Sequence, residues 1–436
     1  MPSTSPTSPA SARGRVLVVL AVVGVLALVV AGVATVLALR SGDGGSSAVP
    51  GATGSSASGR QVRLPTSTDL LDGVDVARLG GAEPWTITRT DANTSGTGIN
   101  SRCQLRRFAD PQGYAALVRV LRGPGSPRRA AVQTVEVSRS PRQADTAYQT
   151  VVGWYADCRA ARLRVLTAYR VTGVGDRAEL LVLRVYGQPA TTLTVAVART
   201  GAVVTSVVAS TDGRPPSTEH VTETLSDALR RLCRSSVAGA CVGTPRVRAV
   251  PPPPAGDGEE RGILAASDLP PVGRVDRPWV GTRPASTTAN PSRTTCDRAT
   301  FAAATGRRTR TFVIPQASLP AQFGLSETYG RFRTPQAARA FLAAVRRAVR
   351  GCAKRDLAAT VGPESAPAHG PGVESAQWRL ATKVSGSRTV RFRVGFVRVG
   401  RTVAQLTLTP VDVADMTEES FAALVVRAGQ RLRELD

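Results

Sequence analysis

Two cysteine pairs with nearly equal spacing constrain the fold of this 436-residue chain more than any other feature. Cys103 and Cys158 are 55 residues apart, and Cys296 and Cys352 are 56 residues apart. The prolines of Ser140-Pro141 and Thr334-Pro335 precede the second cysteine of each pair by the same interval. Agreement of this kind predicts two copies of one domain along the chain.

The matched segments predict the same local structure in both copies. Ser140-Pro141 and Thr334-Pro335 each place a helix-capping hydroxyl before a proline, and proline is tolerated at the first helical position. Apolar residues then recur at helical spacing up to the second cysteine. Pro84-Trp85 also recurs, as Pro278-Trp279, which marks the start of each copy.

The second half of each copy predicts a hairpin and a closing helix. Alternating apolar runs separated by Gly201 in one copy and Gly400 in the other are typical of a β-hairpin. Helices starting at Thr218 and Thr417 follow. This order predicts an α+β fold in which each repeat is an antiparallel sheet covered by helices on one face.

Composition marks the boundaries of the parts. Residues 41–60 are rich in Ser, Gly and Ala, and prolines occupy 251–254, as in linkers. We therefore expect a cytoplasmic tail over 1–15, a transmembrane anchor over 16–39, a flexible linker over 40–63, a first repeat over 64–242, a Pro-rich linker over 243–261 and a second repeat over 262–436.

The run from Val16 to Leu39 carries no charge and is long enough to cross a membrane. Because Arg13 and Arg15 precede it, the positive-inside rule places the N-terminus in the cytoplasm and the bulk of the chain outside. A cleaved signal peptide is the alternative, but its apolar region is usually shorter. The sequence thus predicts a single-pass membrane protein with a signal anchor and two extracytoplasmic, disulfide-bonded α+β domains.

Six cysteines agree with an exported chain, where an even number predicts a disulfide framework. Several pairings are possible, and the repeat favours Cys103–Cys158 and Cys296–Cys352. Cys233 and Cys241 have no counterpart in the second repeat and are then expected to pair with each other.

The formal net charge of +24 would ordinarily indicate a nucleic-acid binder, but the predicted location and an aromatic content of 4% argue against it. On the strand around Phe392 the arginines alternate with the apolar residues, which predicts an arginine-bearing outer face. An anionic partner outside the membrane is the alternative to simple solvation of these charges. The candidate polyanion contacts are Arg346, Arg347, Arg350, Arg391 and Arg393.

No motif for catalysis, metal binding or a cofactor is present. The two histidines, His220 and His369, do not correspond between the copies, and no zinc-ligand spacing or phosphate-binding loop occurs. Asp176 and Glu374 lie at equivalent places and would be the acids of a carboxylate-dependent hydrolase. Acidic residues before a strand are more often turn formers, so we expect no enzyme activity.

Residues 140–158 and 334–352, each a Pro-started helix that ends at a cysteine, resemble the PknH-like extracellular sensor domain of actinobacterial cell-surface proteins. The resemblance implies an α+β, disulfide-bonded domain with a cleft for an unidentified ligand. The chain departs from that family in the position of Cys233 and Cys241 and in having no kinase domain.

Together these features predict a membrane-anchored extracytoplasmic protein, without catalytic activity, that binds a ligand or an envelope partner and no nucleic acid. A cell-envelope scaffold that holds anionic wall polymer through its arginine faces is one alternative, and the hydrolase is another.

Overall fold

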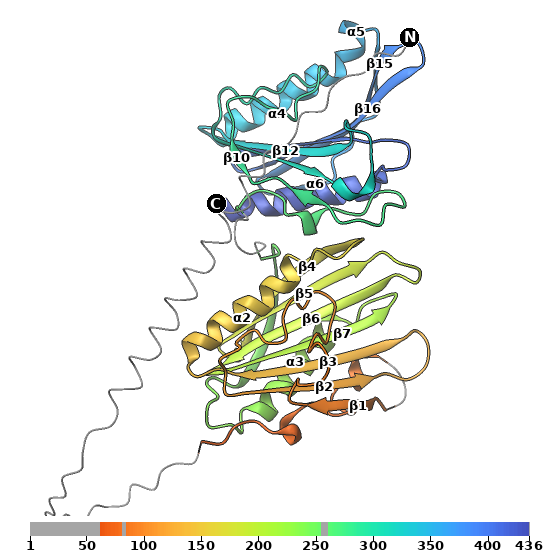
Figure 1. Ribbon diagram of the computed structural model, residues 1–436. Coiled ribbons are helices and arrows are strands. Elements are labelled where there is room, and N and C mark those ends of the chain that lie inside the picture. The colour runs from red at the N-terminus through yellow and green to blue at the C-terminus, as the bar shows by residue number, and fades with distance from the viewer. Residues whose placement is uncertain (1–61, 81–83, 254–259, 436) are drawn as a thin grey trace, which may run out of the picture. The chain divides into compact units, whose positions relative to one another are not determined.

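The computed structural model describes residues 62–80, 84–253 and 260–435 (Figure 1). These residues form two antiparallel sheets, the first from β1 to β8 and the second from β9 to β17.

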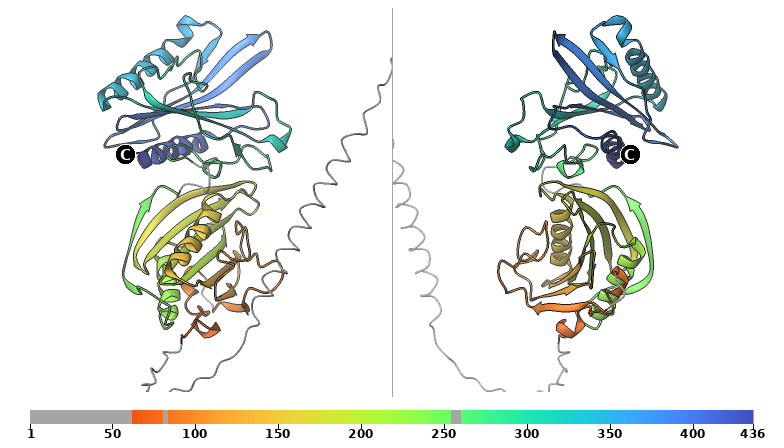
Figure 2. Two further views of the ribbon diagram at one scale, coloured as in Figure 1. Left: turned by 60° about the vertical axis from the view of Figure 1, so that its left-hand side comes forward. Right: turned by 90° about the vertical axis from the view of Figure 1, so that its right-hand side faces the viewer.

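The first sheet has the strand order β1-β2-β3-β7-β6-β5-β4-β8, and it curves strongly around one of its helices (Figure 2). Its strands are β1 (Thr86–Asp91), β2 (Ala115–Arg122), β3 (Arg129–Val137), β4 (Leu163–Val174), β5 (Arg177–Val185), β6 (Thr191–Thr200), β7 (Val203–Asp212) and β8 (Val242–Val250). The predicted hairpin is the β6–β7 pair. The strand β8 occupies the start of the segment that the sequence assigned to a linker.

The second sheet repeats the central order of the first, because β11-β12-β17-β16-β15-β13 follows the connectivity of β2-β3-β7-β6-β5-β4. Its strands are β9 (Val280–Gly281), β10 (Ala285–Ser286), β11 (Thr305–Val313), β12 (Gly324–Arg331), β13 (Ala359–Val361), β14 (His369–Gly370), β15 (Val373–Ser385), β16 (Arg388–Val399) and β17 (Thr402–Thr409). Within the described residues it has no counterpart of β8.

The helices begin where their caps predict. Ser140 and Thr334 accept hydrogen bonds from the backbone N–H groups of Gln143 and Ala337, with a proline at the first helical position of both helices. The closing helices are capped by Ser217 and Thr417, so the cap of the first lies one residue earlier than the sequence indicated. The helices are α2 (Pro141–Ala156), α3 (Thr218–Leu232), α4 (Pro335–Arg350), α5 (Cys352–Arg355) and α6 (Glu418–Leu432), with short 3₁₀ turns η1 (Ser67–Asp69), η2 (Ala77–Leu79), η3 (Ala266–Asp268), η4 (Pro315–Ala317) and η5 (Arg433–Leu435).

Helices cover both faces of each sheet, so the prediction of a single covered face is wrong. Val195 of β6 packs with the buried residues of α2, whereas the next residue, Ala196, packs with those of α3. In the second sheet Phe396 packs in the α4 core and Val397 in the α6 core, and α4 and α6 lie on opposite faces (Figure 1). Alternation of side chains along a strand explains this, since an apolar run without polar interruption is buried on both sides.

The predicted transmembrane helix requires a correction. Residues 16–39 lie outside the described residues, and no described helix is long and apolar enough to cross a membrane. The longest of these, α2 and α4, have 16 residues, whereas a span needs about 20. The membrane-spanning helix of the predicted fold class, and the single-pass location that depends on it, are therefore without support in the residues that the structure describes. The three disulfides indicate an extracytoplasmic protein.

Candidate functional site

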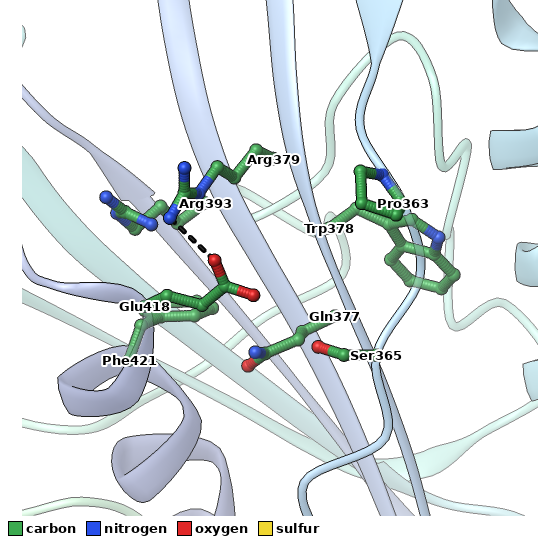
Figure 3. A pocket seen from close by; sticks show the side chains of 8 residues that line it. All are labelled: Pro363, Ser365, Gln377, Trp378, Arg379, Arg393, Glu418 and Phe421. Atoms are coloured by element: carbon green, nitrogen blue, oxygen red, sulfur yellow. Dashed lines mark hydrogen bonds and ion pairs between the residues drawn. The ribbon is translucent and has the colours of Figure 1, made fainter.

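A pocket of about 80 Å³ lies on the α6 side of the second sheet, where α6 begins (Figure 3). Its volume is smaller than the roughly 300–1,000 Å³ that is usual for drug-sized ligands, so it suits a smaller molecule. Strands β15 and β16, the first turn of α6 and the segment between β13 and β14 surround it. The residues that line it are Pro363, Ser365, Gln377, Trp378, Arg379, Arg393, Glu418 and Phe421.

Gln377 directs its side chain into this pocket (Figure 3). The residue is 6% exposed, and its Oε1 accepts no hydrogen bond from any residue that the structure describes. The backbone around it is fixed, because Gln377 and Ser365 exchange N–H to carbonyl hydrogen bonds of 2.8 and 3.1 Å. A buried amide oxygen without a donor costs about 1–3 kcal/mol. A ligand that carries a hydrogen-bond donor would remove this cost.

Two arginines stand beside Gln377 on the same side of the sheet. Arg379 of β15 and Arg393 of β16 are directly opposite each other in the register. Arg393 makes two hydrogen bonds of 2.7 Å to the carboxylate of Asp415 and has a buried side chain. Arg379 pairs with Glu418 at 2.7 Å, and both of these side chains are more than half exposed.

The two ion pairs therefore differ in how easily they exchange partners. The buried guanidinium of Arg393 donates two hydrogen bonds to the Asp415 carboxylate, so this pair is a fixed part of the pocket wall. The Arg379–Glu418 pair lies in water, where such pairs contribute about 0–1 kcal/mol. A carboxylate on a ligand can thus replace Glu418 on the Arg379 guanidinium at little cost.

The first sheet is apolar at the corresponding positions. The turn glycines, Gly201 and Gly400, align the two copies. Gly395, which pairs with Gln377, and Ala196, which pairs with Leu180, lie equally far before these glycines, so Gln377 corresponds to Leu180. Arg393 likewise corresponds to Thr194. Leu180 and Thr194 are fully buried. The polar lining therefore belongs to the second sheet alone and is not required by the repeated fold.

The predicted cysteines form three disulfides. The structure joins Cys103 to Cys158 and Cys296 to Cys352, and Cys233 to Cys241, which are the expected pairs. Cys103–Cys158 and Cys296–Cys352 tie the segment before β2 or β11 to the end of α2 or α4.

The predicted arginine face on β16 is not an outer face. Arg393 is 9% exposed and neutralised by Asp415, because α6 and its preceding turn cover this side of the strand. Arg391 is exposed and pairs with Asp412 at 3.3 Å.

The predicted arginines of α4 also do not form a single cationic surface. Arg346 donates to Glu364, Glu374 and the carbonyl of Ser375. Arg350 lies 3.9 Å from Glu364, and Arg347 is exposed. Their role as polyanion contacts stays a prediction, and acidic neighbours already offset most of their charge.

The carboxylates of the hydrolase alternative act as structural groups. Asp176 accepts hydrogen bonds from the N–H groups of Gly201 and Ala240 and pairs with Arg199 at 3.1 Å. Glu374 pairs with Arg346 and Arg398. Among the described residues no cluster of three or more metal-ligating side chains occurs.

Sequence reasoning missed Gln377 and the buried acid Glu327. Glutamine carries no motif, and the signal that was available is the alignment of Gln377 with Leu180, an apolar position in the other copy. Glu327 of β12 aligns in the same way with Gln133 of β3, and both are fully buried.

Comparisons with known proteins give distant likenesses only. No protein-family profile matches the chain, and no curated protein matches it. The chain is similar to the crystal structure of the extracellular domain of PknH from Mycobacterium tuberculosis, with a TM-score of 0.31 and 13% identity, over 39% of this chain and 95% of that one. It is also similar to DynU16, a protein of the dynemicin biosynthetic locus, with a TM-score of 0.10 and 12% identity, over 86% of this chain and 96% of that one. The relationship to the extracellular sensor domain is therefore a distant one, and it says nothing of what this chain binds.

Proposed function

We propose that this chain is an extracytoplasmic binding protein that holds a small polar ligand in the pocket between β15, β16 and α6. The observation that carries the proposal is the buried Oε1 of Gln377, which faces the pocket without a donor among the described residues. The ring of Phe421 supplies an apolar wall beside it. Arg379 supplies a cation whose partner is exchangeable. A small molecule with a hydrogen-bond donor and a carboxylate fits this lining.

The proposal is for binding and not for catalysis. Asp176 and Glu374, the acids that a hydrolase would need, are held by arginines and backbone groups. Lack of enzyme activity remains our expectation from the sequence.

Gln377→Leu tests the site, because leucine is the residue that the first sheet carries there. Native mass spectrometry of the full chain, purified without denaturation, is expected to show a bound small molecule on the wild type and none on this variant. The variant is expected to fold and to be more stable by about 1–3 kcal/mol, since an unpaired buried oxygen is removed.

Gln149→Leu is the matched control, because Gln149 is an exposed glutamine on α2, on the other sheet. It is expected to retain the ligand. If Gln377→Leu kept the same bound mass as the wild type, the pocket would not be the binding site. If the wild type bound none of the compounds in a thermal-shift screen of carboxylated amides and carried no bound small molecule in native mass spectrometry, the proposed binding function would be wrong.

A further inference from the structure

Strand β8 adds an uncovered edge to the first sheet. It pairs with β4, and the Cys233–Cys241 disulfide and the hydrogen bond from Gly175 N–H to the Cys241 carbonyl (3.2 Å) fix its start. Every residue from Gly243 to Ala249 is exposed. Since strand and disulfide both lack a counterpart in the described part of the second sheet, they are additions to the repeated fold.

The register of β8 places three arginines on one face. Arg248 lies directly opposite Arg170 of β4, and Arg246 lies opposite Thr172, two residues along each strand. Directly opposite residues share a face of the sheet, and so do residues two apart. The neighbouring pair Val247 and Val171 therefore points the other way, where Val171 packs in the α3 core.

These residues, Arg170, Arg246 and Arg248, are called the edge arginines below. All three are exposed, and none has an ion pair or side-chain hydrogen bond with a residue in the described ranges. Helix α2 covers the same face over β5, β6 and β7 and does not extend to this edge.

A nearby pair of arginines in the same sheet is neutralised by acidic residues. Arg177 of β5 and Arg199 of β6 are also directly opposite each other. Asp145 of α2 lies 3.7 and 3.5 Å from them, and Asp176 and Glu179 add further contacts. Glu179 lies directly opposite Arg170 on β5 but forms its ion pair with Arg177. Arg248 on the edge strand faces only Arg170, and like charges that are directly opposite destabilise a sheet.

We propose that the edge arginines bind a linear phosphodiester polymer outside the cell. Arg246 and Arg248 are two residues apart on a strand, which separates them by about 6.6–6.8 Å. The charges of an extended phosphodiester chain with a three-carbon spacer repeat at a similar distance. Arg170 lies one strand away, so one polymer running along the edge meets all three guanidinium groups.

The chemistry of the contact favours phosphate over other anions. A guanidinium presents a planar fork of donors that matches the two non-bridging oxygens of a phosphodiester. The residues of this surface are exposed, which suits a polymer that lies across them and not a small anion that needs a cavity. This site lies on the first sheet and is independent of the ligand pocket proposed above.

The test uses the full chain and purified poly(glycerol phosphate) as the probe. Binding is measured by biolayer interferometry over a salt series for the wild type and for the variant Arg170→Ser, Arg246→Ser, Arg248→Ser. The variant is expected to bind at least about tenfold more weakly, and its slope of log affinity against log salt is expected to be smaller by about 2. The single variant Arg248→Ser is expected to show a smaller loss in the same direction.

The control removes three exposed arginines of the second sheet and its helix that are not candidate polyanion contacts: Arg333→Ser, Arg339→Ser, Arg388→Ser. It changes the net charge equally, so it is expected to bind within about twofold of the wild type. Equal loss in both triple variants would assign binding to net charge and overturn the site. No binding of the wild type at low salt would overturn the proposal outright. Polygalacturonate binding as tightly, with the same response to the variants, would overturn the choice of phosphodiester.

Discussion

Both sheets set one arginine directly opposite another, but the pair beside α6 in the second sheet is neutralised and the pair at the β8 edge of the first sheet is not. Arg379 and Arg393 meet across β15 and β16, and Glu418 and Asp415 at the start of α6 bind them. Arg170 and Arg248 meet across β4 and β8, where neither forms an ion pair with a described residue, although Glu179 of β5 lies opposite Arg170 on its other side. The difference shows that charge compensation depends on which element packs above the strands, and that the sheet register alone does not provide it.

A second comparison concerns one register position inside the sheets. Gln133 lies opposite Arg119 in the first sheet, and Glu327 lies opposite Arg310 in the second. Gln133 accepts a hydrogen bond of 2.7 Å from Leu71 N–H, and Glu327 accepts one of 2.8 Å from Leu264 N–H. Both side chains therefore hold the entry segment of their sheet, one as a neutral amide and the other as an acid.

Burial determines the protonation of that acid. Complete burial raises the pKa of Glu327 to about 8, and the hydrogen bond from Leu264 N–H opposes this only in part. At neutral pH Glu327 is mostly protonated and acts as an isostere of glutamine.

The largest expected change in stability comes from an ion pair that is buried in the second sheet and exposed in the first. Asp69 and Asp268 both accept a hydrogen bond at the start of a 3₁₀ turn. Asp268 binds Arg431, which is 2% exposed, whereas Asp69 binds Arg63, which is 54% exposed. Arg431→Met leaves a buried carboxylate with one weaker partner, Arg427 at 3.6 Å, and is expected to lower the free energy of unfolding by about 3–5 kcal/mol.

Arg63→Met is the matched change in the first sheet and is expected to cost no more than about 1 kcal/mol. Urea titrations of both variants measure the difference. If both variants lost the same free energy of unfolding, burial of the ion pair would not determine how much the pair contributes to stability.

The next effect concerns pH. Because the folded-state pKa of Glu327 lies above its ordinary value of 4.5, the folded chain holds a proton that the unfolded chain releases. The stability it contributes is complete below about pH 4.5 and is lost as pH rises through about 8. Glu327→Gln is expected to match the wild type at pH 5 and to exceed it by roughly 2–4 kcal/mol at pH 9.

The reverse change sharpens the comparison. Gln133→Glu places the same acid in the first sheet and is expected to make its stability fall with rising pH. The free energy of unfolding is measured for each variant between pH 5 and pH 9. If the free energy of Glu327→Gln varied with pH as steeply as that of the wild type, Glu327 would not be the group responsible.

The smallest effect concerns the uncompensated arginines. Arg248→Thr removes one of two opposed like charges at the sheet edge and is expected to raise stability by about 0.2–1 kcal/mol at low salt, with the gain vanishing at high salt. Arg177→Thr should have the opposite sign, because Arg177 pairs with Asp145 and Glu179 and lies over the ring of Tyr148. Thermal unfolding of the two variants at two salt concentrations measures both effects.

Local patterns predicted much of each repeat. The caps Ser140, Thr334 and Thr417 and the turn glycines Gly201 and Gly400 appear where the sequence placed them, because capping and tight turns depend on neighbouring residues. The strand β8 was not foreseen, since its exposed residues have no apolar alternation and its existence rests on pairing with β4.

The sequence by itself determined the order in which the matched helices and the hairpin recur and the three disulfide partners, because periodicity, caps and cysteine spacing are local or directly countable. It did not determine which side chains lose water. The tertiary structure alone decided that Gln377 is buried beside a pocket, that Glu327 is kept neutral, that Arg393 is neutralised and that Arg248 is left exposed. These outcomes depend on which elements approach a strand from above, and burial and charge pairing arise only from that approach.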